Sequence, residues 1–102
     1  MMIADTDVYT LKSLINKMGI KVTNYCIGRI MQRLGGVPLE KFVFDLGYAY
    51  GCYRKKTRKA IRKTKFRVNR EGACVRKEYF VHVNGIIFVF CKDNLVSVYV
   101  KG

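Results

Sequence analysis

The Asn84-Gly85 dipeptide is the feature that most limits the folds open to this chain, because an apolar segment lies on each side of it. Asn-Gly between two such segments is the strongest short-range signal of a β-hairpin. A second tight turn is predicted at Asp93-Asn94. Together the two turns predict an antiparallel meander, whose strands are residues 74–83, 86–91 and 95–100.

The register of this meander decides which side chains share a face. Two-residue turns set Val83 opposite Ile86 and Lys92 opposite Leu95. One face then carries Arg76, Glu78, Phe80, His82, Ile87, Val89, Cys91, Val96, Val98 and Val100. The other carries Tyr79, Val81, Val83, Ile86, Phe88, Phe90, Leu95 and Tyr99. Both faces are largely apolar, so either helices cover both, or helices cover one and a second copy covers the other in a homodimer.

Apolar residues recur at helical spacing through the first half of the chain, which predicts three helices. Caps are expected at Asp5 or Thr6 and at Thr23, Pro38 suits the first turn of the third helix, and the helices are expected to end at Gly19, Gly35-Gly36 and Gly51. A length of 102 residues suits one domain. We therefore predict an α+β fold over residues 1–102, in which a helical part, 1–53, packs on a C-terminal three- to four-stranded antiparallel meander sheet, 74–101.

Positive charge is concentrated in one segment of the chain. The formal net charge is +13, and residues 54–77 hold twelve Lys or Arg against a single acid, Glu71. The remainder of the chain is close to neutral. Charge localised in this way attracts polyanions. A solvated surface that only keeps the protein soluble is the alternative, although ordinary surfaces mix both signs.

Residues 54–70 fit a fourth helix, with an extended basic arm as the competing structure. In the helix, Tyr53, Ala60 and Ile61 gather on one side and cations form the other. Like charges three and four residues apart repel, so packing or a bound anion would have to hold this helix. The side chains predicted to contact nucleic-acid phosphates are Arg54, Lys55, Arg58, Lys59, Arg62, Lys63, Lys65, Arg67 and Arg70.

The sequence argues against a metal site and against a cofactor. The chain has one His and four separated cysteines, without the paired spacing of zinc ligands. Its glycines suit helix ends and form no phosphate loop. A two-metal nuclease draws on clustered acids, whereas most carboxylates here are scattered, at Asp5, Asp7, Glu40, Asp45 and Asp93. We expect neither metal nor cofactor.

Cellular location is indicated by the N-terminus and the cysteines. The chain begins with acids rather than a signal peptide, and no apolar run approaches the length of a membrane span. We therefore expect a cytoplasmic protein without a membrane partner. The thiols expected to be free and mostly buried in that reducing compartment are Cys26, Cys52, Cys74 and Cys91.

His82 is the only candidate acid–base group with an ordinary pKa near neutrality. It shares a predicted face with Arg76 and Glu78, and a base, an acid and a cation are what a metal-free RNase needs. Glu78 and His82 are about 13 Å apart along a strand, so they can only flank a substrate. A polar strand end without catalysis is the alternative for these three candidates.

Aromatic side chains of the predicted sheet offer a second kind of contact. Such rings can stack on bases where one face is open. Their alternation with Val, Ile and Leu is instead typical of a core. The rings concerned are Tyr79, Phe88, Phe90 and Tyr99.

The order of features from Thr23 onward carries a resemblance. RIMQRLG is followed by FVFDLGYAYG, a basic segment and KEYFVHVNGIIFVFCKDNLVSVY. This order resembles small proteins of bacteria and their phages that are similar to the RNase-toxin superfamily of barnase, EndoU, colicin and RelE-like folds. The resemblance implies helices followed by a curved antiparallel sheet, and RNA as the ligand class. It matches the RNase-like histidine with His82 and carries over no other active-site residue.

Three functions follow as hypotheses. The first is a nucleic-acid-binding protein, with RNA favoured, that contacts phosphates through residues 54–70. The second is a phage-encoded inhibitor of a host nucleic-acid enzyme, of the anti-CRISPR type, which docks in the host cytoplasm on the guide RNA or acidic groove of a ribonucleoprotein. The third is a metal-free RNase that uses His82, Glu78 and Arg76. We favour the first, a binding protein without catalysis.

Overall fold

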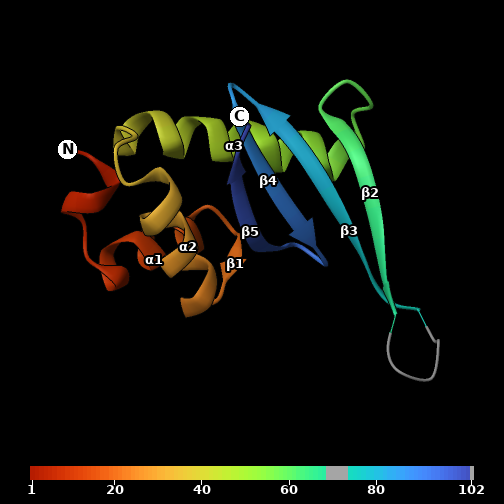
Figure 1. The fold of residues 1–102 in the computed structure, drawn as a ribbon, viewed down its shortest axis with the longest axis horizontal. Coiled ribbons are helices and arrows are strands. Elements are labelled where there is room, and N and C mark those ends of the chain that lie inside the picture. The colour runs from red at the N-terminus through yellow and green to blue at the C-terminus, as the bar shows by residue number, and fades with distance from the viewer. Residues whose placement is uncertain (69–73, 102) are drawn as a thin grey trace.

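A computed structural model describes residues 1–68 and 74–101, which form helices packed on one sheet (Figure 1). The helices are η1 (Ile3–Asp5), α1 (Val8–Lys17), α2 (Asn24–Leu34) and α3 (Leu39–Lys55). The strands are β1 (Lys21–Val22), β2 (Ile61–Val68), β3 (Cys74–Val83), β4 (Ile86–Cys91) and β5 (Asn94–Val100). The predicted α+β class is confirmed.

The sheet has five strands in the order β1-β5-β4-β3-β2. Strands β3 to β5 form the predicted antiparallel meander, β2 is added antiparallel to β3, and β1 is added parallel to β5. The sheet therefore has one strand more than the upper value of the expectation. Strand β1 has only two residues, too few to show an alternating pattern.

The helix boundaries follow the predicted caps in part. Thr23 caps α2 by accepting a hydrogen bond from the backbone N–H of Cys26 at 3.1 Å. The cap of α1 is Asp7, which accepts from the N–H of Thr10 at 2.7 Å, and not the predicted Asp5 or Thr6. Over residues 1–68 and 74–101 no helix combines the length and apolar character that crossing a membrane requires.

Helix α3 does not end at Gly51 as predicted but continues to Lys55. A helical glycine costs about 1 kcal/mol relative to alanine. The extra turn buries Cys52 and Tyr53 against the sheet, and full burial of one large apolar side chain stabilises by about 1.5–3 kcal/mol. The helix ends where Lys56 adopts a left-handed conformation with φ 54°.

One face of the sheet is packed against helices and the other is open. Helix α3 crosses behind β3 and β4, while α2 packs beside β5 (Figure 1). The buried core includes Phe42, Leu46 and Ala49 of α3 and, from the sheet, Val81, Phe88, Phe90, Leu95 and Val98. No helix of the described ranges covers the opposite face, so the alternative with helices on both faces is wrong. A homodimer through that face stays a prediction.

The Asn84-Gly85 hairpin is confirmed. Both residues have positive φ, 48° and 81°, which suits the twist of a two-residue hairpin turn. Buried Asp45 of α3 accepts a hydrogen bond from the Asn84 amide at 2.9 Å and pairs with Lys41 at 2.8 Å. The turn between β3 and β4 is thereby fixed to the helix layer.

The second turn lies one residue earlier than predicted. Its central residues are Lys92 and Asp93, with φ 50° and 64°, and Cys91 pairs with Asn94. The predicted turn at Asp93-Asn94 is therefore wrong, as is the predicted pairing of Lys92 with Leu95. Leu95 lies opposite Phe90 instead.

A β-bulge in β5 exchanges the predicted faces of its last residues. Phe90 pairs with Leu95 but Val89 pairs with Ser97, so Val96 is an extra residue on β5. One extra residue turns every later side chain to the other face. Val98 is consequently fully buried in the core, whereas Tyr99 lies on the open face with 38% of its surface exposed.

The predicted basic helix over residues 54–70 is wrong. Only Arg54 and Lys55 are helical, and residues 61–68 form the edge strand β2. Cations repel one another along a helix, but they suit an edge strand, which they protect from pairing with other chains. The alternative prediction, an extended basic arm, is closer to the strand conformation of β2. The last two residues of the segment, 69 and 70, lie outside the described residues.

Three cysteines confirm the expected free and buried thiols. Cys26, Cys52 and Cys91 are buried and form no disulfide. Burial raises the pKa of the Cys26 thiol to about 12, so this group stays protonated and contributes packing rather than reactivity.

Candidate nucleic-acid interface

The predicted phosphate contacts that the structure describes lie on the exposed surface. The structure describes seven of these side chains, and all seven are exposed: Arg54, Lys55, Arg58, Lys59, Arg62, Lys63 and Lys65. Of these seven, only Arg54 pairs with a carboxylate of the described residues, Asp93 at 4.0 Å. Arg67 lies in β2, but its side chain falls outside the description, as does Arg70 entirely. The remaining six cations are available to an external anion.

The strand geometry of β2 divides its side chains between the two faces of the sheet. Lys63 pairs with Phe80, and Lys65 pairs with Glu78, so both lysines lie on the open face of the sheet. The Lys63 ammonium lies 5.5 Å from the centroid of the Phe80 ring. The cations are therefore placed beside aromatic side chains, an arrangement that no helix over residues 54–70 would have produced.

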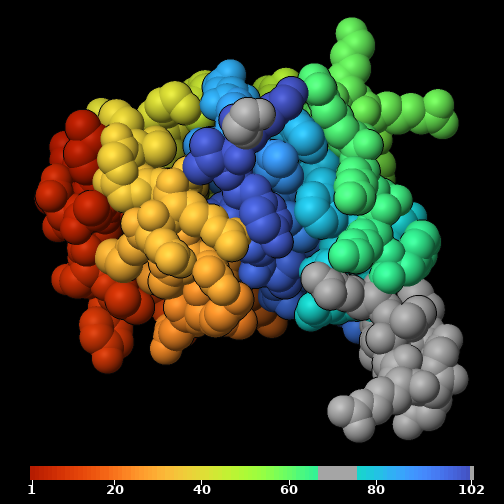
Figure 2. Space-filling model, in the orientation of Figure 1, coloured from red at the N-terminus to blue at the C-terminus, as the bar shows by residue number. Residues whose placement is uncertain are grey.

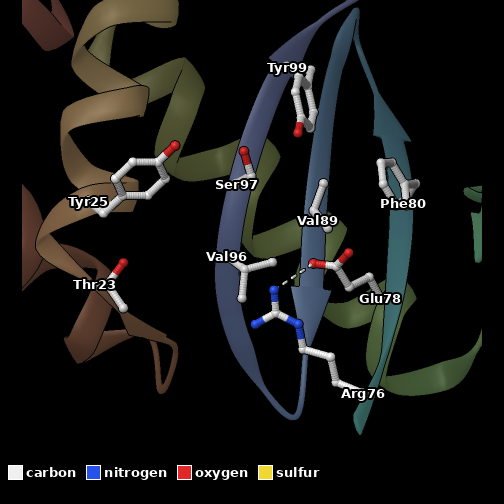
Figure 3. A pocket seen from close by; sticks show the side chains of 9 residues that line it. All are labelled: Thr23, Tyr25, Arg76, Glu78, Phe80, Val89, Val96, Ser97 and Tyr99. Carbon is white, nitrogen blue, oxygen red and sulfur yellow. Dashed lines mark ion pairs between the residues drawn. The ribbon is translucent and has the colours of Figure 1, made fainter. Parts of the chain in front are cut away.

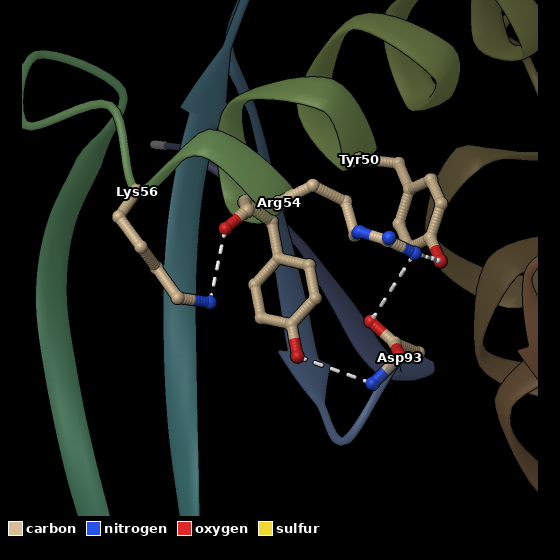
Figure 4. A network of polar contacts seen from close by, with 5 residues as sticks. Tyr50, Arg54, Lys56 and Asp93 are labelled. Atoms are coloured by element: carbon tan, nitrogen blue, oxygen red, sulfur yellow. Dashed lines mark hydrogen bonds and ion pairs between the residues drawn. The ribbon is translucent and has the colours of Figure 1, made fainter.

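The C-terminal end of α3 is tied to the turn between β4 and β5 (Figure 4). The Tyr53 hydroxyl accepts a hydrogen bond from the backbone N–H of Asp93 at 3.1 Å. Arg54 donates to the Tyr50 hydroxyl at 3.2 Å, and Lys56 donates to the Tyr53 carbonyl at 3.0 Å. Burial raises the pKa of Tyr53 above its ordinary value, so its hydroxyl is neutral at physiological pH. These contacts fix the position from which the basic segment begins.

The open face of the sheet holds a shallow cavity of about 300 Å³. Figure 3 shows its lining: Thr23, Tyr25, Arg76, Glu78, Phe80, Val89, Val96, Ser97 and Tyr99. In Figure 2 the strands of this face lie between α2 on one side and β2 on the other. The cavity combines an apolar floor, aromatic rings and charged groups, which is the composition of a binding site for a partly polar ligand.

Two aromatic rings stand side by side in this cavity. The ring centroids of Phe80 and Tyr99 are 6.4 Å apart, and their planes differ by 12°. The Arg33 guanidinium lies 4.6 Å from the centroid of the Tyr99 ring and donates to the carbonyl oxygen of Val98 at 2.8 Å. Rings and a cation therefore lie next to one another on the open face.

Some of these residues escaped the sequence analysis. Phe88 and Phe90 are core residues and Tyr79 packs against the core, as the alternation indicated, while Tyr99 is not, because of the bulge. Phe80 and Arg33 were not singled out. The available signal was the pair Arg29 and Arg33, one helical turn apart in RIMQRLG.

The three predicted catalytic candidates do not line one cavity. Arg76 and Glu78 lie 3.8 Å apart and line the open-face cavity, where the Glu78 side chain is 5% exposed. His82 lines a different cavity, near the Asn84 turn, with Asp45 among its neighbours. The arrangement therefore gives the metal-free RNase no added support, and these roles stay predictions.

His82 is held in its neutral form. Its Nδ1 atom is buried without a hydrogen-bond partner among the described residues. Burial, followed by the positive charges of Arg62 and Lys101, lowers the pKa of His82 from the ordinary 6.5. A proton on this ring is therefore disfavoured in the folded state.

The low pKa of His82 predicts acid sensitivity. The unfolded chain binds a proton near pH 6.5 and the folded chain only below it, so the free energy of unfolding should decrease as pH falls through 6.5 towards the folded-state pKa. Urea denaturation at about pH 7.5 and about pH 5 should show a smaller loss for His82→Gln than for the native chain. Equal losses in the two proteins would contradict this assignment.

Comparisons with known proteins identified no relative of this chain. A scan against protein-family models, a search of curated proteins and a search of solved structures each found no match. The resemblance to RNase toxins therefore stays a prediction. Within residues 1–68 and 74–101, no three His, Cys, Asp or Glu side chains gather in a group that could hold a metal ion.

Proposed function

We propose that this protein binds nucleic acid, with RNA favoured, and that the basic segment supplies the phosphate contacts. Lys and Arg side chains neutralise phosphates and release the counterions condensed around them. Such contacts position a nucleic acid and give affinity, but they carry no sequence information. The binding is therefore expected to be strong at low salt and weakly selective among sequences.

The observation that carries this proposal is that the described cations in β2 and just before it are exposed and mostly lack a carboxylate partner among the described residues. Six of the seven described predicted contacts have no carboxylate partner among the described residues, and all seven are exposed. A segment that only served solubility would be expected to mix both signs or to pair its charges internally. These charges extend from the end of α3 along an edge strand, and an elongated polyanion can follow such a path.

Purification from a native lysate at low salt tests the proposal. We expect nucleic acid to co-purify and to be lost after nuclease treatment or a high-salt wash. A matched preparation in which Arg58, Lys59, Lys63 and Lys65 are changed to Gln should retain much less. Recovery of a ribonucleoprotein that survives RNase treatment would instead favour the inhibitor hypothesis. Recovery of the protein free of any polyanion would contradict both.

A further inference from the structure

The open face carries a row of two aromatic rings flanked by two cations, which runs from α2 to β2. Arg33 lies over one side of the Tyr99 ring at 4.6 Å, and Phe80 follows Tyr99 at 6.4 Å. Lys63 lies 5.5 Å from the Phe80 ring. The strand order β5-β4-β3-β2 and the packing of α2 on β5 fix the sequence of the row as Arg33, Tyr99, Phe80, Lys63. Each ring thus has a cation on its outer side, and the two ring planes are within 12° of parallel.

The distance between the two ring centroids is close to the spacing of two rings on either side of an inserted base. Stacked bases lie about 3.4 Å apart, so a base between two rings needs about 6.8 Å. The rings of Phe80 and Tyr99 are 6.4 Å apart and within 12° of parallel. Both side chains are partly exposed, so rotation of their rings can bring the two faces together around a base. Figure 3 shows Tyr99 above Val89 and Phe80 to one side of it.

The surroundings of this slot suit the rest of a nucleotide. Val89 is 2% exposed and forms an apolar floor between the rings. Ser97 lines the same cavity and offers a hydroxyl to the edge of a base. Arg33 and Lys63 at the two ends of the row, with Lys65 and Arg76 nearby, carry charge suited to phosphates.

The same charges argue against a second copy of the chain as the occupant of this face. In a two-fold dimer each patch meets its own equivalent. The cations of this face, Arg33, Lys63, Lys65 and Arg76, would then approach cations of the partner. Like charges brought together across an interface are unfavourable. An anionic ligand with flat rings satisfies both the charges and the aromatic slot.

We propose that the open sheet face binds single-stranded nucleic acid, with one unstacked base inserted between Phe80 and Tyr99. This inference rests on the proposed function and gives it a substrate class. In a duplex the bases are stacked inside the helix and reach such a slot only after being flipped out. In a single strand they are accessible, and base–aromatic stacking adds affinity that depends little on sequence.

A single tryptophan reports on the slot directly. The chain contains no Trp, so Phe80→Trp places the only indole in the row. We expect a single strand of about 12 nucleotides to quench its fluorescence. The duplex of the same sequence and heparin, a polyanion without bases, should bind without comparable quenching. Tyr48→Trp, at an exposed position on α3, is the matched control and should respond to none of the three probes.

Leucine variants measure the contribution of stacking to affinity. Phe80→Leu and Tyr99→Leu keep apolar cover over Val89 but remove a flat ring. Each should weaken single-strand binding about tenfold at every salt concentration, with an unchanged salt dependence. Heparin affinity should not change. Urea denaturation establishes whether each leucine variant is folded. If a leucine variant is unfolded, the fluorescence of Phe80→Trp still tests whether a base enters the slot.

The outcomes separate this inference from the proposed function. Binding of single strand and heparin without quenching in Phe80→Trp, or unchanged single-strand affinity in both leucine variants, would overturn the base slot and leave polyanion binding intact. Failure to bind any of the three probes at low salt would overturn the proposed function as well. A concentration-dependent dimer that single strand cannot dissociate would show that a second copy occupies the face, and would overturn the slot.

Discussion

The affinity of the protein for single-stranded RNA should fall by roughly 10³–10⁵ between 50 and 200 mM salt. This range applies when six to ten phosphates are neutralised, and nine cations of residues 54–70 are predicted to contact phosphates. Each such contact releases condensed counterions, so the logarithm of the binding constant falls linearly with the logarithm of the salt concentration. Fluorescence anisotropy of a labelled oligonucleotide across a salt series measures the slope.

Removing four of the cations should change that slope by a defined amount. A variant in which Arg58, Lys59, Lys63 and Lys65 become Gln loses four contacts, and its slope should be shallower by about 3. The control variant changes Lys17 and Lys21 to Gln. These residues lie on α1 and on β1, the edge strand opposite β2, and both are exposed. The control removes two charges rather than four, so a change in its slope about half as large as in the basic-segment variant would mean that net charge alone governs binding.

Tyr53→Ala should lower the free energy of unfolding by about 3–5 kcal/mol, the range for removing a large aromatic side chain from a core. Tyr53 is 4% exposed and stacks on Phe90 with ring centroids 4.9 Å apart. Its ring also meets Tyr79 edge-on at 5.3 Å, and the ammonium of Lys56 lies 3.9 Å from its centroid. Truncation leaves a cavity between α3 and the sheet and removes all of these contacts.

Two further substitutions help to interpret the effect of Tyr53→Ala: one isolates the contribution of the hydroxyl, and the other is a control at an exposed site. Tyr53→Phe keeps the ring and removes only the hydroxyl that accepts from the Asp93 N–H, so it should cost about 1 kcal/mol. Tyr48→Ala, at a site 60% exposed on the same helix, should cost much less than Tyr53→Ala. Urea denaturation of the three variants gives the comparison. A small effect of Tyr53→Ala would mean that the end of α3 is not held by this side chain.

The meander was predictable because its determinants are local. Asn84-Gly85 and the apolar runs beside it determine the first hairpin within a few residues, and β3 and β4 begin and end where the pattern placed them. The helix caps were predictable to within about two residues for the same reason. Local chemistry of this kind is present in the sequence whatever the rest of the chain does.

Other features depend on contacts between distant segments. The basic segment has the composition of a solvated helix, yet pairing with β3 makes residues 61–68 a strand. The extra residue Val96 has no sequence signal, and it alone moved Tyr99 to the open face and Val98 to the core. The row of Arg33, Tyr99, Phe80 and Lys63 brings together three strands and a helix, so periodicity within one element could not reveal it.

The position of β2 at the border of the sheet links ligand binding to colloidal behaviour. Such a border exposes backbone groups on which a foreign strand can template itself, and mutual repulsion between lysines is what discourages this. A polyanion laid along β2 would neutralise that repulsion and, at the same time, sterically shield the border. The ligand thus protects the bound form from pairing with a foreign strand, and the charge of the lysines protects the free form. Without nucleic acid, the four-Gln variant lacks both kinds of protection. It should therefore form fibrils more readily than either form of the native chain.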